Sequence, residues 1–90
     1  MYISEKFDTY YNALSKEDQL KAAKAVLVIC EDHERYMESK KKEMQELLLQ
    51  ASEAAVALDL EKFTTIRVAA EKIYNNIIPI ERFIEINFGL

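Results

Sequence analysis

Glycine and proline are almost absent from this chain of 90 residues, which contains one of each, Pro79 and Gly89. Residues 16–58 contain neither, so that segment lacks the two residue types that most strongly interrupt a helix. At about 1.5 Å per residue a helix of this length reaches roughly 60 Å, more than twice the extent of a compact domain of this size. The sequence therefore predicts a long helix that another surface must cover.

Cysteine and histidine are equally scarce, since Cys30 and His33 are the single representatives of their types. A lone cysteine cannot form a disulfide within its chain, and the apolar run at residues 22–30 predicts a buried thiol in a reducing compartment, for which the cytoplasm fits best. Cys30 and His33 share a helical face, but a zinc site needs three or four protein ligands. We expect no metal and no other cofactor.

Motifs for catalysis and for membrane insertion are also lacking. The chain has no glycine-rich phosphate loop and no nucleophile in a recognisable triad context, so we do not expect an enzyme. No stretch approaches the roughly eighteen apolar residues that a membrane span needs, and the first residues do not form a signal peptide, so we expect no membrane partner.

The net charge of −4 weighs against a nucleic-acid surface. The basic run at residues 39–42 is an alternative anion site, although its lysines also pair with glutamates at helical spacing.

Four helices are predicted in a single all-α domain of residues 1–90. They cover residues 4–14, 16–58, 60–76 and 79–87. Ser4, Ser15 and Asp59 are suited to capping the first three. Because the turn at Asp59 is tight, the C-terminal arm is expected to run antiparallel to the long central helix, as a helical hairpin. Pro79 disfavours a helical residue before it, so the arm should break there.

The long helix carries a seam with alternating steps of three and four residues, the spacing of heptad a and d positions. Its positions are Leu20, Ala23, Leu27, Cys30, Glu34, Met37, Lys41, Met44, Leu48, Ala51, Ala55 and Leu58. Only Glu34 and Lys41 are polar. A mostly charged middle at residues 31–46 separates two more apolar ends, each predicted to form a small core. After the turn a second pattern follows Leu60, Phe63, Arg67 or Ile66, Ala70, Ile73 or Tyr74, and Ile77.

The apolar segment at residues 73–88 has the least obvious cover from its own chain, because the hairpin register places much of it opposite the charged middle of the long helix. Leaving one large apolar side chain in water forgoes about 1.5 to 3 kcal/mol, so we predict that this segment meets a partner surface and that the chain forms a homodimeric bundle. Tyrosine suits such a surface because it buries a large ring and keeps a hydrogen-bonding hydroxyl. The predicted partner and dimer interface comprises Tyr11, Tyr36, Tyr74, Ile77, Ile78, Ile80, Phe83 and Ile84.

Residues 51–74 resemble a single tetratricopeptide-type hairpin. The small residues Ala51, Ala54 and Ala55 precede the turn, and Phe63, Ala69 and Ala70 follow it. The resemblance covers about a quarter of the chain, lacks the expected glycine and occurs once, whereas such folds need several repeats. We do not take it as family membership, and it implies only peptide or helix binding.

The sequence thus predicts a small non-enzymatic module for protein–protein interaction, of the adaptor, cochaperone or inhibitor and regulator type. Its partner is another protein, and self-association is expected. An alternative is a structural homo-oligomer such as a coiled-coil spacer, which requires an intact seam and is disfavoured by Glu34 and Lys41. A DNA-associated regulator is a further alternative, disfavoured by the negative net charge.

Overall fold

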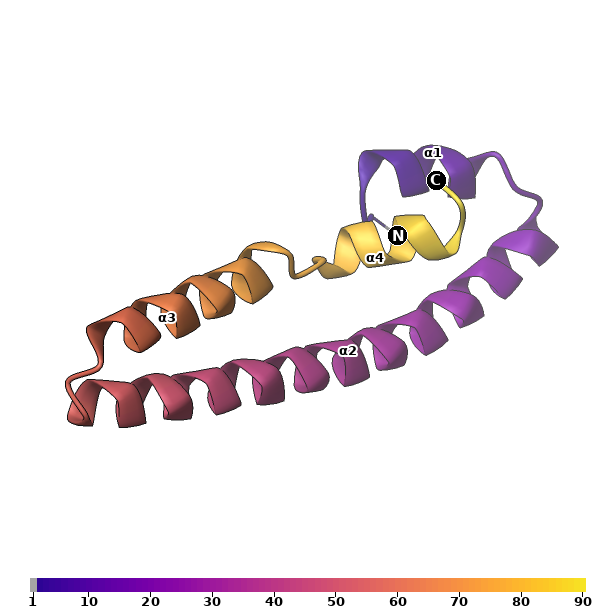
Figure 1. Cartoon of the computed structure of the whole chain (residues 1–90). Helices are drawn as coiled ribbons and strands as arrows, with labels where there is room; N and C mark the ends of the chain where they lie inside the picture. Colours follow the sequence, from indigo (N-terminus) through magenta and orange to yellow (C-terminus); the bar gives the residue numbers. More distant parts are fainter. Residues whose placement is uncertain (1) are drawn as a thin grey trace. The chain divides into compact units, whose positions relative to one another are not determined.

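The computed structural model describes residues 2–90, and within them the chain forms four helices and no strand. They are α1 (Glu5–Asn12), α2 (Lys16–Val56), α3 (Leu60–Asn75) and α4 (Ile80–Asn87) (Figure 1). The predicted all-α class, with one long helix and shorter flanking helices, is confirmed. Each predicted boundary lies within two residues of the observed one, and the charged middle at residues 31–46 is helical throughout.

Side-chain caps fix where the first three helices begin. The hydroxyls of Ser4 and Ser15 each accept a hydrogen bond from the amide three residues later, at 3.2 Å. The Asp59 carboxylate accepts one from the Lys62 amide at 3.1 Å. These bonds satisfy amides that have no partner within their own helix, as predicted. α4 begins directly after Pro79, one residue later than expected, because proline takes the N-cap position itself.

A backbone motif at the end of α2 reverses the chain. Leu58 has a φ of 59°, in the left-handed region that a side chain disfavours. The Leu58 amide donates to the Ala55 carbonyl at 3.1 Å, and the Asp59 amide donates to the Ala54 carbonyl at 2.9 Å. This pair of bonds is the Schellman motif, in which glycine usually occupies the left-handed position. With Asp59 already capping α3, the turn is as tight as the sequence predicts.

The chain divides into two compact units. Unit 1 contains the residues up to Arg35 together with Ile78–Leu90, and unit 2 contains Tyr36–Ile77. α1 and α4 belong to unit 1, α3 belongs to unit 2, and α2 supplies residues to both. That the chain acts as a single domain over residues 1–90 stays a prediction.

The core of unit 1 is built from three helices. Phe7 of α1 is fully buried, and Val26 and Ile29 of α2 and Ile84 of α4 complete the cluster. The Phe7 and Phe88 rings form an edge-to-face pair with 5.2 Å between centroids. Aromatic pairs in this arrangement add about 0.5 to 1.5 kcal/mol to the area that they bury.

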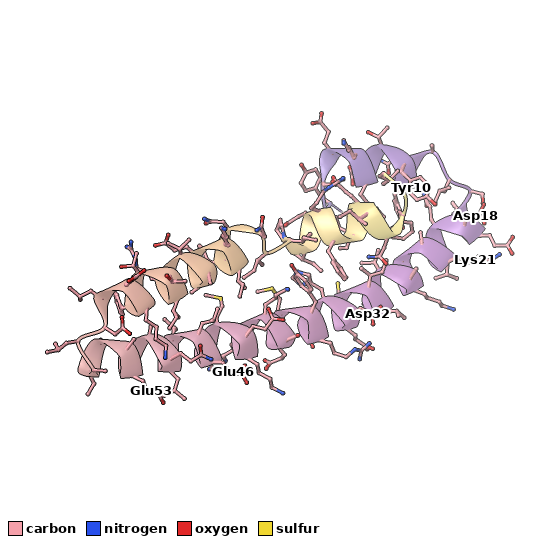
Figure 2. The ribbon with its side chains drawn as sticks, in the orientation of Figure 1. Tyr10, Asp18, Lys21, Asp32, Glu46 and Glu53 are labelled. Atoms are coloured by element: carbon pink, nitrogen blue, oxygen red, sulfur yellow. The ribbon has the colours of Figure 1, made fainter. Side chains whose placement is uncertain are left out.

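The core of unit 2 is smaller and lies between α2 and α3. Ala51 and Ala54 of α2 are buried against Ile66 of α3, with Leu47 and Phe63 packed around them. Alanine on the contact face lets the two helix backbones approach closely. Glu46 and Glu53 project from α2 away from α3 (Figure 2), so the charged face of the helix is turned from the core. The two predicted small cores are both present.

The row of α2 that is buried in unit 1 differs from the predicted seam. Ala22, Val26 and Ile29 are buried, whereas the seam residues Leu20 and Leu27 are 57% and 67% exposed. Two apolar rows lie next to each other on this helix, and heptad counting cannot tell which of them α1 and α4 will cover. The seam residues Leu20 and Leu27 therefore lie on the surface of unit 1, and their coverage by another chain stays a prediction.

Candidate protein-binding groove

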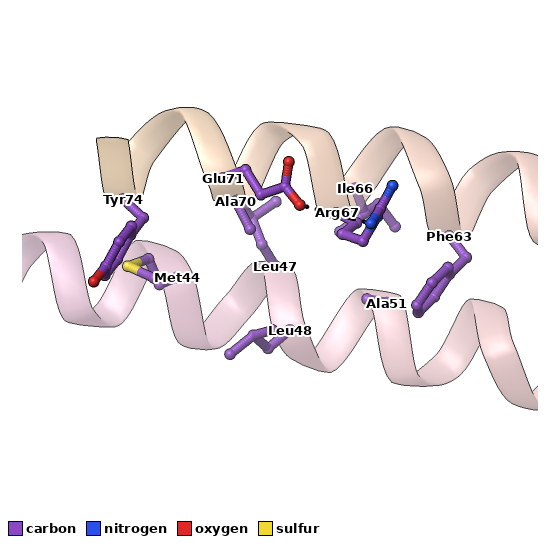
Figure 3. Close-up of a pocket in the computed structure, with 10 residues that line it drawn as sticks. All are labelled: Met44, Leu47, Leu48, Ala51, Phe63, Ile66, Arg67, Ala70, Glu71 and Tyr74. Carbon is purple, nitrogen blue, oxygen red and sulfur yellow. Dashed lines mark ion pairs between the residues drawn. The ribbon is translucent and has the colours of Figure 1, made fainter. Parts of the chain in front are cut away.

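An apolar groove runs between α2 and α3 in unit 2 (Figure 3). Its volume is about 280 Å³. From α2 it is lined by Met44, Leu47, Leu48 and Ala51. From α3 it is lined by Phe63, Ile66, Arg67, Ala70, Glu71 and Tyr74. Eight of these ten side chains are aliphatic or aromatic, so the groove offers a surface that water solvates poorly.

A second hollow of about 380 Å³ continues the groove toward Met37 and Ile77. The two hollows share Met44, Leu48 and Tyr74, and together we call them the α2–α3 groove. Methionine is unbranched and polarizable, so it adapts to the shape of whatever packs on it. The shared residues lie in the middle of the groove and connect its two halves into one surface.

The groove exists because each helix carries two neighbouring apolar rows. The first row faces the other helix: Leu47 points toward Ala70 in Figure 3, and Ile66 is buried. The second row is offset from the first by about one residue along each helix and remains open to solvent. Its members Leu48 and Tyr74 are 58% and 67% exposed. Two helices alone can cover only the first row.

One ion pair lies in the lining of the first hollow, which is otherwise apolar, whereas the second hollow also includes Glu38, Lys41 and Gln45. Arg67 and Glu71 are one turn apart on α3, with 3.7 Å between Nη1 and Oε1 and 58% of each side chain exposed. Such an exposed pair stabilises a helix by only about 0.3 to 0.5 kcal/mol. Its contribution to folding is therefore small, and both groups remain accessible to a molecule that enters the groove.

Three of the predicted interface residues belong to unit 2. Tyr74 and Ile77 line the α2–α3 groove, as a partner surface requires. Tyr36 is half-buried on α2 and lies outside the groove lining, with the Lys40 ammonium 5.8 Å from its ring centroid. The structure thus brings Tyr74 and Ile77 together and leaves Tyr36 apart from them.

The other predicted interface residues belong to unit 1, where four of the five lie in its core or pack against it. Ile84 keeps only 2% of its exposure and sits in the core, so we remove it from the interface. Tyr11, Ile80 and Phe83 are half-buried and pack against the same core. The Ile78 carbonyl accepts a hydrogen bond from His33 Nε2 at 2.8 Å.

The α4 residues are covered within unit 1 because the fully buried Phe7 ring of α1 supplies apolar cover for α4. The hairpin register alone places this C-terminal segment opposite charged residues, which predicts that it lacks cover from its own chain.

Several groove residues were not predicted as site residues. Met44, Leu48 and Ala51 belong to the predicted seam of the long helix, and Phe63 and Ala70 belong to the apolar pattern after the turn. The signal was present in both patterns. Placing the two rows side by side, in the register that the tight turn imposes, would have indicated the groove.

The two side chains considered for metal binding, Cys30 and His33, make other contacts. Cys30 is a half-buried free thiol, and the Nε2 atom of His33 is bonded to the Ile78 carbonyl. Within residues 2–90 no group of three or more His, Cys, Asp or Glu side chains is arranged to hold a metal ion. Among the helices of this same range, none combines the length and the apolar character needed to cross a bilayer.

Comparisons with protein families, with curated proteins and with solved structures find no match to this chain.

Proposed function

We propose that the protein is a small non-enzymatic protein–protein interaction module of the adaptor, cochaperone or regulator type, and that it binds a helical surface of its partner in the α2–α3 groove. One observation carries this proposal: Leu48 and Tyr74 line the groove and are 58% and 67% exposed. Exposed apolar surface of this kind, flanked by polar residues, is typical of interaction sites.

Leu48 and Tyr74 also determine how much free energy a partner can gain by binding in the groove. Covering apolar surface contributes about 25 cal/mol per Å², so a partner that covers Leu48 and Tyr74 gains a few kcal/mol before its ordering costs. A groove between two helices accepts a third helix, whose apolar residues at every third or fourth position fill it. Met37 and Met44 can adapt to the shape of such a helix.

The net charge of −4 and the single half-buried Cys30 support further parts of this proposal. The charge favours a protein partner over nucleic acid. The unpaired thiol favours a reducing compartment, and we propose the cytoplasm. Self-association of the groove face is one form that the proposed binding takes.

A coiled-coil spacer is a second candidate because part of the predicted seam is exposed. Leu20 and Leu27 of unit 1 are 57% and 67% exposed, which a homo-oligomer along α2 would cover. Glu34 and Lys41 interrupt that row, so we place this candidate second.

Affinity capture with matched variants tests the proposed function. The immobilised chain is exposed to a lysate of its source cells, and captured proteins are quantified by mass spectrometry. Leu48→Glu places a charge in the groove, whereas Leu49→Glu places it on a neighbouring leucine of similar exposure that does not line the groove. We expect wild type and Leu49→Glu to enrich the same partner and Leu48→Glu to lose it. Equal enrichment by all three, each verified as helical by circular dichroism, would refute the proposal.

A further inference from the structure

We propose that the α2–α3 groove is occupied by the same groove of a second copy of this chain, packed antiparallel across a two-fold axis. The inference rests on the proposed function and names the occupant of its site. It draws on two features of the groove face, its charges and the sizes of its side chains, each of which is complementary to itself.

Unit 2 has the construction of half a four-helix bundle. Its own core is thin, since the cluster between the helices has only Ala51, Ala54 and Ile66 as buried members. Each helix then presents a further apolar row on the groove side, represented by Leu48 on α2 and Tyr74 on α3. In a four-helix bundle both rows are buried, because a second helix pair covers the second row.

Two charges of the first hollow, those of Arg67 and Glu71, are self-complementary. Arg67 and Glu71 lie one turn apart on α3, both half-exposed. A two-fold axis that passes between them and runs across the helix places Arg67 of one copy opposite Glu71 of the other, and the reverse pair forms at the same time. A single patch then makes two ion pairs with itself. A partner without this symmetry would have to supply the opposite pattern independently.

The sizes of the side chains on α2 are also self-complementary, about a point midway between Leu48 and Ala51. Along this side of α2 the sequence reads Met44, Leu48, Ala51 and Ala55, two large residues followed by two small ones, of which Ala51 lies at the buried floor of the groove and Ala55 lies beyond its lining. An antiparallel copy centred between Leu48 and Ala51 sets Leu48 against Ala51 and Met44 against Ala55. Large residues facing small ones let two helices interdigitate without voids or overlap.

The two centres fall at about the same level of the hairpin. Tyr74 lies across from Met44, and Ala70 lies across from Leu47 (Figure 3). The point midway between Arg67 and Glu71 on α3 is therefore within one helical turn of the point midway between Leu48 and Ala51 on α2. One axis can serve both patterns, and it also brings Tyr74 of each copy toward Phe63 of the other.

The size of the face sets the expected strength. α3 has 16 residues, so a face two helices wide measures about 24 Å by about 20 Å, roughly 480 Å² in projection. Side chains corrugate the surface and raise its accessible area toward the ~800 Å² per partner of a standard interface. We expect a dimer that dissociates in the micromolar range.

Charge reversal, followed by sedimentation equilibrium from about 1 to 500 µM, tests the arrangement. Wild type should shift from the 10.5 kDa monomer to twice that mass across this range. Arg67→Glu and Glu71→Arg each place like charges opposite each other twice, and each should raise the dissociation constant at least about tenfold. An equimolar mixture of these two variants should restore the dimer as a heterodimer. The double variant Arg67→Glu/Glu71→Arg should dimerise as wild type does.

Leu48→Glu and Leu49→Glu provide the apolar counterpart, and only Leu48→Glu should prevent dimerisation. A wild type that stays monomeric at 500 µM would overturn the inference, as would single reversals that leave the dissociation constant unchanged or a mixture that stays monomeric. In each of these cases a captured partner that is lost with Leu48→Glu and kept with Leu49→Glu would still support the proposed function. The two proposals therefore fail separately.

Discussion

The imidazole of His33 donates a hydrogen bond from Nε2 to the carbonyl oxygen of Ile78, with 2.8 Å between the two atoms. A carbonyl oxygen only accepts, so Nε2 carries the proton. Ile78 immediately precedes Pro79, in the short connection between α3 and α4. The bond therefore ties this connection to α2 within unit 1, close to the Phe83 ring, whose centroid is 5.1 Å from that of His33.

Replacing His33 by leucine should destabilise the protein by about 1 kcal/mol, because leucine retains apolar contact with Phe83 but removes the hydrogen bond to the Ile78 carbonyl. Urea denaturation followed by circular dichroism measures the difference. Glu34→Leu changes an exposed neighbour on the same helix and should stay within about 0.5 kcal/mol of wild type. Equal effects of the two substitutions would show that the hydrogen bond contributes nothing.

The helix ends could be predicted because the interactions that fix them are local. Ser4, Ser15 and Asp59 each bond an amide three residues along the chain, so residue type and spacing are sufficient evidence. Pro79 likewise acts on its own position and on the residue before it. For these features the sequence contains all the interacting groups within one helical turn.

The contacts between helices were harder to predict because they join distant segments. Nothing near Ile84 in the sequence indicates that Phe7 will cover it, so the exposure of α4 was overestimated. On α2 two apolar rows compete, and only the position of the neighbouring helices decides that Val26 is buried and Leu27 exposed. For the groove, Tyr74 was predicted but Leu48 was not, since its exposure depends on the register of α3.

Phe7→Ala should destabilise unit 1 by about 3 to 5 kcal/mol, because the ring is fully buried and its removal leaves a cavity that α1 and α4 cannot fill. Chemical denaturation gives the magnitude. Tyr2→Ala is the matched aromatic control, and since Tyr2 is 77% exposed its removal should change stability by less than about 0.5 kcal/mol. A loss below about 1 kcal/mol for Phe7→Ala would contradict the assignment of this ring to the core.

Glu85 should make stability depend on acid pH. A hydrogen bond from the Ser4 hydroxyl, and then one from Arg82, lower the pKa of Glu85 from the ordinary value of 4.5. Since the folded pKa lies below the unfolded one, this stabilisation is complete above about pH 4.5 and is lost as the pH falls through the folded pKa. As the pH falls below about 4.5, the unfolding free energy of wild type should decrease more steeply than that of Glu85→Gln.

Glu81→Gln, an exposed change on the same helix, is the control for that comparison and should retain the wild-type slope. Parallel pH profiles for wild type and Glu85→Gln would mean that the contacts of this carboxylate with Ser4 and Arg82 do not stabilise the folded state.

Asp59→Ala should lower stability by about 1 kcal/mol, because the Lys62 amide at the start of α3 loses its side-chain acceptor. Asp59→Asn is the informative control, since asparagine caps helices about as well as aspartate without carrying a charge. Thermal melts should therefore show a lower midpoint for the alanine variant than for the asparagine variant. Coincident midpoints of all three proteins would place the start of α3 elsewhere.

Leu58→Gly should act in the opposite direction at the same turn. Leu58 holds a φ of 59°, a conformation that costs a residue with a side chain about 1 kcal/mol and costs glycine nothing. The leucine is 83% exposed, so its removal gives up little burial. Part of the gain is offset because glycine has more freedom in the unfolded chain, which leaves a net stabilisation of about 0.5 kcal/mol. For a domain of this size that corresponds to a rise in melting temperature of about 2 to 4 °C.

Leu58→Ala separates the two contributions: it removes the same exposed side chain but retains Cβ and its strain, and should not raise the midpoint. If alanine stabilises the protein as much as glycine does, the gain comes from removing an exposed leucine and the left-handed backbone is not the cause.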